Sequence, residues 1–407
     1  MTSHQPTGSA SRELRAFDGV ICFGGEDWWY HNRGHFDMQL MRELSTRVPV
    51  LYVNSIGMRV PRPSEGAMFL TRVRRKLRSL RRGLVRVRPN FAVLSPLAAP
   101  GRAGRFVTTT IMPRQVARAA KSIGITRPLV WVACPPGAQA LDALRPVGVV
   151  YQRTDKFEEF PHVDRCAIES YDRALKDRAD LTLFCSRLLY EAERRSCRAA
   201  LFVDHGVDFE RFARAGRHPA SEPADVRGLP RPRVGFIGGI DAHTFDPPLF
   251  ERVVDAMADV HFVLVGACSL PEGWLRDRRN VTFVGQKPYD DVPGYMAACD
   301  VLVMPWNRSD WIRACNPIKL KEYLAVGRPV VSTSYDELER TWRDYVSIAD
   351  GAEAFTTAIR DALTNRGDAE RRRARVAEET WTRKAENVVN QLARCGVDLW
   401  RDAPALR

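Results

Sequence analysis

Short runs of apolar residues recur along the chain, and most of them end in Gly, Pro or polar residues. They lie at 18–24, 48–55, 128–134, 147–155 and 179–186 in the first half, and at 233–239, 260–266, 281–285, 300–306 and 328–333 in the second half. Segments with helical apolar spacing separate several of these runs. Buried strands that alternate with helices are typical of parallel sheets covered on both faces. The pattern predicts an α/β protein whose ligands bind at the carboxyl ends of its strands.

A stretch without apolar periodicity separates the two groups of predicted strands. Residues 213–232 are rich in Pro, Gly, Ala and Arg and predict an interdomain linker. We therefore expect a first domain at 16–212 and a second domain at 233–380, each long enough for its own core. Residues 1–15 are polar and predict a disordered lead-in rather than a signal peptide, and residues 381–407 predict a helical closing segment.

The composition is that of a globular protein with a large basic excess. The 407 residues are 45% hydrophobic, and no apolar run approaches the roughly 18 residues that span a bilayer. The nine cysteines are scattered without a CxxC pair, which predicts reduced thiols in a cytoplasmic protein rather than a disulfide framework or a zinc site. The net charge of +13 suits acidic ligands, nucleic acid or an anionic membrane surface.

Residues 69–88 concentrate the positive charge, with nine Lys and Arg residues and no acidic residue. Their apolar residues recur every three or four positions and predict one helix face: Leu70, Val73, Leu77, Leu80 and Leu84. A basic amphipathic helix fits the interface of an anionic bilayer. The alternative is a surface helix whose leucines pack on its own domain. Nucleic-acid binding is not favoured, because no aromatic side chains are interleaved for base stacking.

The segment NPIKLKEYLAVGRPVV, residues 316–331, predicts a helix from about Pro317 to Ala325 that stops at Gly327. The N-terminal end of such a helix suits a diphosphate, because free amides and a partial positive charge meet the ligand there. Lys319 adds a point charge, and Glu322 can accept hydrogen bonds from a ribose diol. The alternative is an ordinary helix with a solvated Lys and Glu.

Two further segments extend this pattern. Residues 284–306 are VGQKPYDDVPGYMAACDVLVMPW, and residues 233–240, RVGFIGGI, are a strand that runs into two glycines. In this order the three segments resemble the nucleotide-sugar-binding half of a GT-B glycosyltransferase, in particular glycosyltransferase family 4 and its bacterial exopolysaccharide and cell-wall relatives. The resemblance covers about residues 233–335. It implies two Rossmann-like domains with parallel sheets facing across a cleft, and a closing segment that crosses back to the first domain.

The resemblance assigns the donor site to the second domain. Glu322 matches the second glutamate of a family pair, which holds the ribose hydroxyls. Ala314 stands where the first glutamate contacts the donor sugar, so we expect a neighbour to replace it, from among Asp310, Arg313 and Asn316. The loop at Gly285 and Gln286 borders the nucleobase in relatives, or is a plain turn. The expected donor-binding residues are Gly238, Gly239, Gly285, Gln286, Asn316, Pro317, Ile318, Lys319, Leu320 and Glu322.

The first domain is expected to bind the acceptor. Gly24 and Gly25 end its first strand, and an aromatic and polar loop follows. The acceptor candidates in this loop are Trp28, His31 and His35, although lone histidines also serve packing. The Asp155 carboxylate stands where the family often has an aspartate after a histidine. It would orient a sugar hydroxyl, take a proton from the acceptor, or cap a helix.

These observations predict a glycosyltransferase that moves a sugar from a nucleotide-diphosphate sugar to a glycan or lipid-linked acceptor. Its catalytic candidates are Asp155, Lys319 and Glu322. The resemblance implies retention of configuration. We expect neither metal nor cofactor, since Asp290 and Asp291 lack Asp-x-Asp spacing. A cytoplasmic location with peripheral attachment to the inner face of the plasma membrane is expected through residues 69–88. The alternatives are a nucleotide-sugar epimerase of the same fold and a catalytically silent, membrane-docked subunit.

Overall fold

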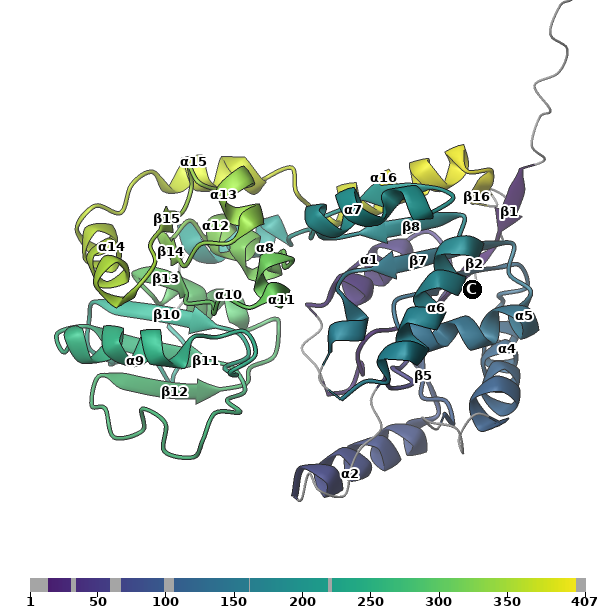
Figure 1. Ribbon diagram of the computed structural model, residues 1–407, viewed down its shortest axis with the longest axis horizontal. Coiled ribbons are helices and arrows are strands. Elements are labelled where there is room, and N and C mark those ends of the chain that lie inside the picture. The colour runs from purple at the N-terminus through teal and green to yellow at the C-terminus, as the bar shows by residue number, and fades with distance from the viewer. Residues whose placement is uncertain are drawn as a thin grey trace, which may run out of the picture.

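The computed structural model describes residues 14–30, 34–58, 67–98, 106–160, 162–218 and 222–399. Two α/β domains lie next to each other along the longest axis of the molecule (Figure 1). Each domain has a mostly parallel sheet covered by helices, as the sequence predicts. The expected lead-in at 1–15 lies outside the described residues as far as residue 13, but Arg15 already belongs to a strand.

The first domain is built on an eight-stranded sheet. Its order is β4 (Leu84–Arg88), β5 (Phe91–Leu94), β3 (Val50–Val53), β2 (Gly19–Phe23), β6 (Pro128–Val132), β7 (Gly148–Arg153), β8 (Leu181–Phe184) and β9 (Ala200–Phe202). Only β4 is antiparallel to its neighbour. The helices are α1 (Phe36–Leu44), α2 (Ala67–Arg82), α4 (Met112–Ser122), α5 (Leu141–Leu144), α6 (Arg165–Arg178) and α7 (Arg187–Glu193). Successive residues of β2 enter the cores on opposite faces of the sheet, because side chains alternate along a strand.

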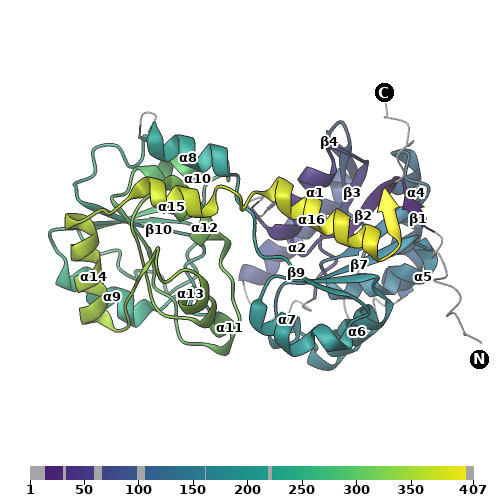
Figure 2. The same cartoon turned by 90° about the horizontal axis from the view of Figure 1, so that it is seen from above.

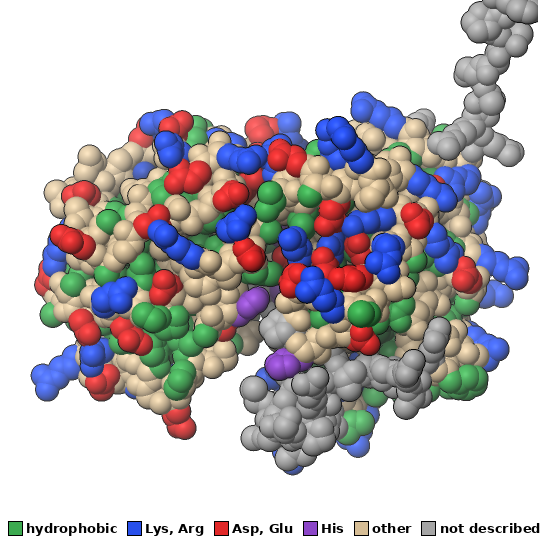
Figure 3. Space-filling model, in the orientation of Figure 1, with side chains coloured by type: hydrophobic (Ala, Val, Ile, Leu, Met, Phe, Trp, Pro, Cys, Tyr) green, Lys and Arg blue, Asp and Glu red, His purple; other side chains and the backbone are tan. Residues whose placement is uncertain are grey.

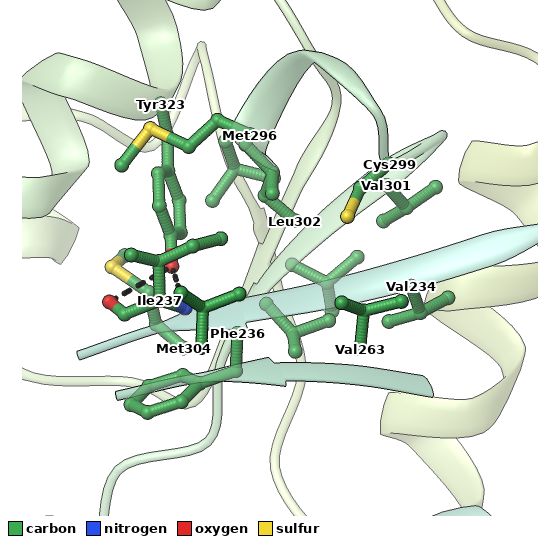
Figure 4. Close-up of a cluster of buried hydrophobic side chains, with 14 of the residues drawn as sticks. Val234, Phe236, Ile237, Val263, Met296, Cys299, Val301, Leu302, Met304 and Tyr323 are labelled. Carbon is green, nitrogen blue, oxygen red and sulfur yellow. Dashed lines mark hydrogen bonds between the residues drawn. The ribbon is translucent and has the colours of Figure 1, made fainter. Parts of the chain in front are cut away.

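The second domain has a six-stranded parallel sheet. Its order is β12 (Val281–Gly285), β11 (His261–Val265), β10 (Arg233–Ile237), β13 (Val301–Met304), β14 (Val330–Ser332) and β15 (Ser347–Ile348). The helices are α8 (Phe209–Arg217), α9 (Pro247–Ala256), α10 (Val292–Ala297), α11 (Asp310–Arg313), α12 (Ile318–Val326), α13 (Asp336–Thr341), α14 (Ala352–Thr364) and α15 (Ala369–Val376). Figure 4 shows the core between β10, β13 and the helices, where Tyr323 of α12 reaches the end of β10. The Ile237 amide donates to the Tyr323 hydroxyl at 2.9 Å, so the helix and the strand end are held together.

The chain crosses between the domains twice. After α15 it returns to the first domain as α16 (Trp381–Arg394), which packs on α1, and ends in β16 (Val397–Leu399), parallel to β1 (Arg15–Phe17) (Figure 2). The two crossings lie side by side, because the Val207 amide donates to the Glu379 carbonyl at 2.8 Å. The predicted linker at 213–232 is wrong at its start, since α8 extends to Arg217 and buries Phe212 in the second domain.

A cluster of charged side chains holds the crossings to the second domain. The ammonium group of Lys321, in α12, lies 2.6 Å from both Asp204 Oδ2 and the His205 carbonyl oxygen and 3.0 Å from Glu379 Oε2. Lys384 of α16 pairs with the same two carboxylates. Burial alone would raise the pKa of Asp204, but the two ammonium groups outweigh it and lower this pKa to about 2. Both carboxylates therefore stay charged in the folded protein.

The basic segment at 69–88 is not one helix. Helix α2 ends at Arg82, Gly83 turns the chain with φ +59°, and β4 follows on the edge of the sheet. Leu84 therefore belongs to a strand, and the side chain of Leu77 is 54% exposed rather than packed on its domain. The side chains of residues 67–73 lie outside the described ones. None of the helices in the described ranges has both the length and the apolar character needed to span a bilayer.

We expect Lys321→Met to lower the free energy of unfolding by about 3 kcal/mol, because it removes one partner from a buried ion cluster. The exposed pair of Arg360 and Asp259 provides the control, and Arg360→Met should cost less than about 1 kcal/mol. Urea unfolding followed by tryptophan fluorescence measures both values. Equal losses in the two variants would contradict the importance of the cluster.

Candidate active site in the interdomain cleft

A cavity of about 540 Å³ lies between the two domains and is lined by residues of both. The surface is hollowed between the domains in Figure 3. Residues that follow β2 and β7 form the wall of the first domain, and residues that follow β10 and β13 form the opposite wall with the start of α12. The cavity therefore lies at the carboxyl ends of both parallel sheets, where α/β proteins bind their ligands.

Lys319 is the cation of the second-domain wall. Its Nζ lies 4.6 Å from the ring centroid of Phe236 and 4.4 Å from that of Trp306. Burial lowers the pKa of Lys319 to about 8. Gly238 has φ +152°, and a Cβ atom at this position would lie 2.1 Å from Nζ. Glycine is thus required at 238 for the lysine to occupy its place.

Glu322 follows Lys319 by one helical turn and is buried, with 4% exposure. The Tyr289 hydroxyl donates a hydrogen bond to Glu322 Oε1 at 2.7 Å. Burial raises the pKa of Glu322 to about 7, although this hydrogen bond and the charge of Lys319 oppose the shift. Glu322 is not among the residues that line the cavity, so its carboxyl group lies beside the site rather than on its wall.

The other expected donor residues separate into two groups. Gly239, Asn316, Pro317 and Ile318 line the cavity together with Lys319. The Asn316 side chain also donates to the Cys185 carbonyl of the first domain at 3.1 Å. Three others do not line it: Leu320, which is 1% exposed in the core, and the pair Gly285 and Gln286 at the end of β12.

A second cavity of about 260 Å³ adjoins the first and is lined by Ala314, the position at which the family resemblance implies a glutamate. Asp155 belongs to the lining of both cavities. Of the three expected substitutes for the missing glutamate, Asp310 lines the smaller cavity and Asn316 the larger one. Arg313 lines neither and pairs with Asp310 at 2.9 Å.

The residues predicted to bind the acceptor lie in different environments. Gly25 and His35 line the larger cavity, whereas Gly24 packs on Tyr52, whose ring a Cβ at 24 would meet at 2.1 Å. Trp28 is wrong as a cavity residue: it is 5% exposed, and its ring packs on Tyr52 and Phe91. A buried tryptophan ring contributes more to the stability of the domain than a ring exposed on a loop. His31 lies outside the described residues.

Asp155 lies on the first-domain wall, and burial raises its pKa to about 6. The neighbouring Arg153 holds the loop that carries Asp155 through a set of ion pairs. The Arg153 guanidinium donates to both oxygens of Glu158 at 2.8 Å and to Glu193 at 3.2 Å, which joins the loop to α7. Asp155 is thus presented on a loop whose base is held by a buried ion network.

Two carboxylates of the same wall were not predicted from the sequence, Glu26 and Asp37. Asp37 is the one acidic residue in the first turn of α1, among apolar neighbours. A charged residue on the buried face of a helix was the signal available in the sequence. The described residues, those of this wall included, contain no group of three or more His, Cys, Asp or Glu side chains placed to hold a metal ion.

Comparison with known proteins agrees with this geometry. Residues 231–365 match the family model described as glycosyl transferases group 1. A protein of Bacillus subtilis (strain 168), named as the teichuronic acid biosynthesis glycosyltransferase TuaH, is 29% identical over 192 residues. The match covers 45% of this chain and 47% of TuaH, so the chain spans about half the length of this relative.

Solved structures match almost the whole chain. Anabaena Alr3699/HepE in complex with UDP and glucose has a TM-score of 0.65 at 14% identity, covering 93% of this chain and 99% of that one. Sucrose-phosphate synthase from Thermosynechococcus elongatus has a TM-score of 0.62 at 19% identity, with 93% and 98% covered. The α,α-trehalose-phosphate synthase (UDP-forming) from Burkholderia vietnamiensis has 0.61 at 13%, with 92% and 99% covered. At these identities the similarity shows the fold.

The chain therefore has the GT-B fold, and its second domain matches the group 1 glycosyl transferases, which supports the class predicted from the sequence.

Proposed function

We propose that this protein transfers a sugar from a nucleotide-diphosphate sugar to a hydroxyl of a glycan or lipid-linked acceptor. One observation carries the proposal: the Lys319 ammonium group and the start of α12 lie opposite the first-domain carboxylates across a single cavity. The leaving diphosphate gains negative charge as the glycosidic bond breaks, and donors already in place stabilise that charge. Two structurally similar proteins, HepE in complex with UDP and glucose and the UDP-forming trehalose-phosphate synthase, support a nucleotide donor.

Each candidate residue has a distinct part in this proposal. Lys319 and the amides of Ile318 and its neighbours bind the diphosphate. Glu322, as a carboxylate, accepts hydrogen bonds from the ribose hydroxyls. Asp155 orients the acceptor hydroxyl or takes its proton as the new bond to the sugar forms. Retention of configuration rests on the family resemblance and independence of metal on the spacing of Asp290 and Asp291, and both are part of the proposal. The name of TuaH supports a place in polysaccharide biosynthesis.

A turnover assay tests the reaction against its two alternatives. Purified protein is incubated with radiolabelled UDP-, GDP- and dTDP-sugars, with and without bacterial membrane extract. We expect label to move into the extract with one donor, and Lys319→Met to reduce the rate at least about 100-fold, the scale for loss of a charge-stabilising donor. An epimerase would convert its nucleotide sugar without extract. A silent subunit would leave every donor unchanged.

Nucleotide affinity should depend on pH through two groups. Glu322 ionises above its pKa of about 7, which improves its acceptance of ribose hydroxyls, and Lys319 loses its charge above about 8. Affinity should therefore rise through pH 7, peak between the two values and fall above pH 8. Thermal shifts with UDP, GDP and ADP across this range measure it. Glu322→Gln should remove the acidic limb and keep the alkaline one; an unchanged profile would contradict the assignment.

We also propose that α2 attaches the protein to an anionic membrane surface, at the inner face of the plasma membrane. The helix lies at the lower edge of the first domain in Figure 1. Among its described contacts with the domain, Ser79 donates to Asp27 at 3.0 Å and Lys76 to the Ser55 carbonyl at 3.1 Å, and Arg82 lies over the Trp29 ring. Leu77 is exposed between basic residues, so both the apolar and the cationic side chains are available to a bilayer.

Charge reversal on α2 tests the attachment. The exposed residues Arg74, Arg78 and Arg81 are changed together to Glu, and vesicles with 30% phosphatidylglycerol are sedimented with the protein. We expect binding to fall at least about 100-fold, since each basic residue at the surface contributes about 1 kcal/mol. The control reverses three exposed basic residues of α4: Arg114, Arg118 and Lys121. Equal losses in the two variants would mean that only net charge matters.

A further inference from the structure

Asp37 has a position that its structural contacts do not account for fully. It lies in the first turn of α1, is 3% exposed, and lines the larger cavity. One carboxylate oxygen, Oδ2, accepts hydrogen bonds from the Gly25 amide at 2.9 Å and from the Tyr52 hydroxyl at 2.8 Å. These bonds hold the carboxyl group against the glycine loop that ends β2. They use only one of its two oxygens.

The second oxygen of Asp37, Oδ1, has no hydrogen-bond donor among the residues that the structure describes. This oxygen is not one of the described side-chain atoms that are fully buried without a partner, so it is accessible from the cavity that Asp37 lines. Asp37 borders the cavity, so a bound molecule can supply the missing donor. A hydroxyl group is a donor of the right kind for this oxygen.

The surroundings of Asp37 restrict the kind of molecule that can bind beside it and donate to Oδ1. Glu26 and Asp155 line the same wall, and none of the described first-domain residues on it is a lysine or arginine. Phe36 and Phe157 place aromatic rings there, which suit the apolar face of a sugar ring. Lys319, the one Lys or Arg among the described lining residues, belongs to the opposite wall together with Asp241. A carboxylate or phosphate group near Asp37 would meet like charges, whereas a hydroxyl would not.

We propose that Asp37 is an acceptor-binding residue, and that the sugar at this subsite is uncharged and presents a hydroxyl to Asp37 Oδ1. The inference rests on the proposed function, because the first-domain wall holds the acceptor only if the second domain holds the donor. It adds a substrate class: neutral glycosyl acceptors are bound, and uronic acid or phosphorylated sugars are excluded at this position.

Asp37→Asn tests the role of this oxygen with little change of shape. The asparagine carbonyl still accepts from Gly25 and Tyr52, but its amide group turns a hydrogen-bond donor toward the cavity. We expect the KM for acceptor to rise about tenfold or more, with the KM for donor and the thermal shift with UDP and GDP unchanged. A purely structural role would instead weaken donor and acceptor binding together.

Asp18→Asn is the matched control. Asp18 is 7% exposed and accepts hydrogen bonds from the Thr126 and Arg127 amides, but it does not line the cavity. We expect this variant to lose stability comparable to that of Asp37→Asn and to keep its KM for acceptor. An acceptor KM that is unchanged in Asp37→Asn, or raised equally in both variants, would overturn the proposal.

A binding measurement separates the inference from the proposed reaction. Saturation-transfer NMR on the full chain compares methyl β-D-glucoside with methyl β-D-glucuronide, and methyl β-D-galactoside with methyl β-D-galacturonide. We expect contact with at least one neutral glycoside, none with its uronide, and loss of the neutral signal in Asp37→Asn. This result without turnover of any donor would refute the transferase reaction and leave the neutral-sugar subsite. Signals from the uronides as strong as from the neutral sugars, or no signal from either neutral glycoside, would overturn the subsite.

Discussion

The ammonium group of Lys321 connects α12 to both segments that join the domains, and the arrangement of the cleft depends on it. A charge with 1% exposure is tolerated because oxygens of Asp204, His205 and Glu379 surround it. Residues two apart on an α-helix point about 200° apart, so Lys319 must face away from the crossings. The ion cluster thus sets the rotation of α12, and with it the side of the helix that meets the cavity.

Three ionisable residues within one turn of α12 consequently meet three environments. Lys319 lies over aromatic rings, Lys321 among carboxylates, and Glu322 beside a tyrosine hydroxyl. Burial moves the pKa of Lys319 down to about 8 and that of Glu322 up to about 7, so both groups titrate near neutrality. Groups with such pKa values are concentrated at functional sites, and here a helix N-terminus adds its own positive potential.

The two walls of the cavity differ in charge, and the proposed reaction would use that difference. Negative charge develops on a leaving diphosphate, and a proton is released from the attacking hydroxyl. Lys319 lies on the second-domain wall together with Asp241, whereas Glu26, Asp37 and Asp155 lie on the first-domain wall. Each domain alone carries only one wall of the cavity of about 540 Å³. The contacts between the two crossings therefore matter, because they join the domains that carry the two walls.

The sequence by itself determined the central strands of both sheets, the two glycines after β10 and the N-terminal end of α12, because apolar runs and Pro or Gly signals act over a few residues. It therefore also indicated the donor half of the cleft and the GT-B class. It did not determine where two apolar side chains lie: Trp28 is buried in the core, and Leu77 is exposed. It could not reveal that Asp37 approaches Gly25 or that Lys321 meets Glu379. Those contacts join residues distant in the chain, and only the packing of complete domains decides which side chains a buried charge will meet.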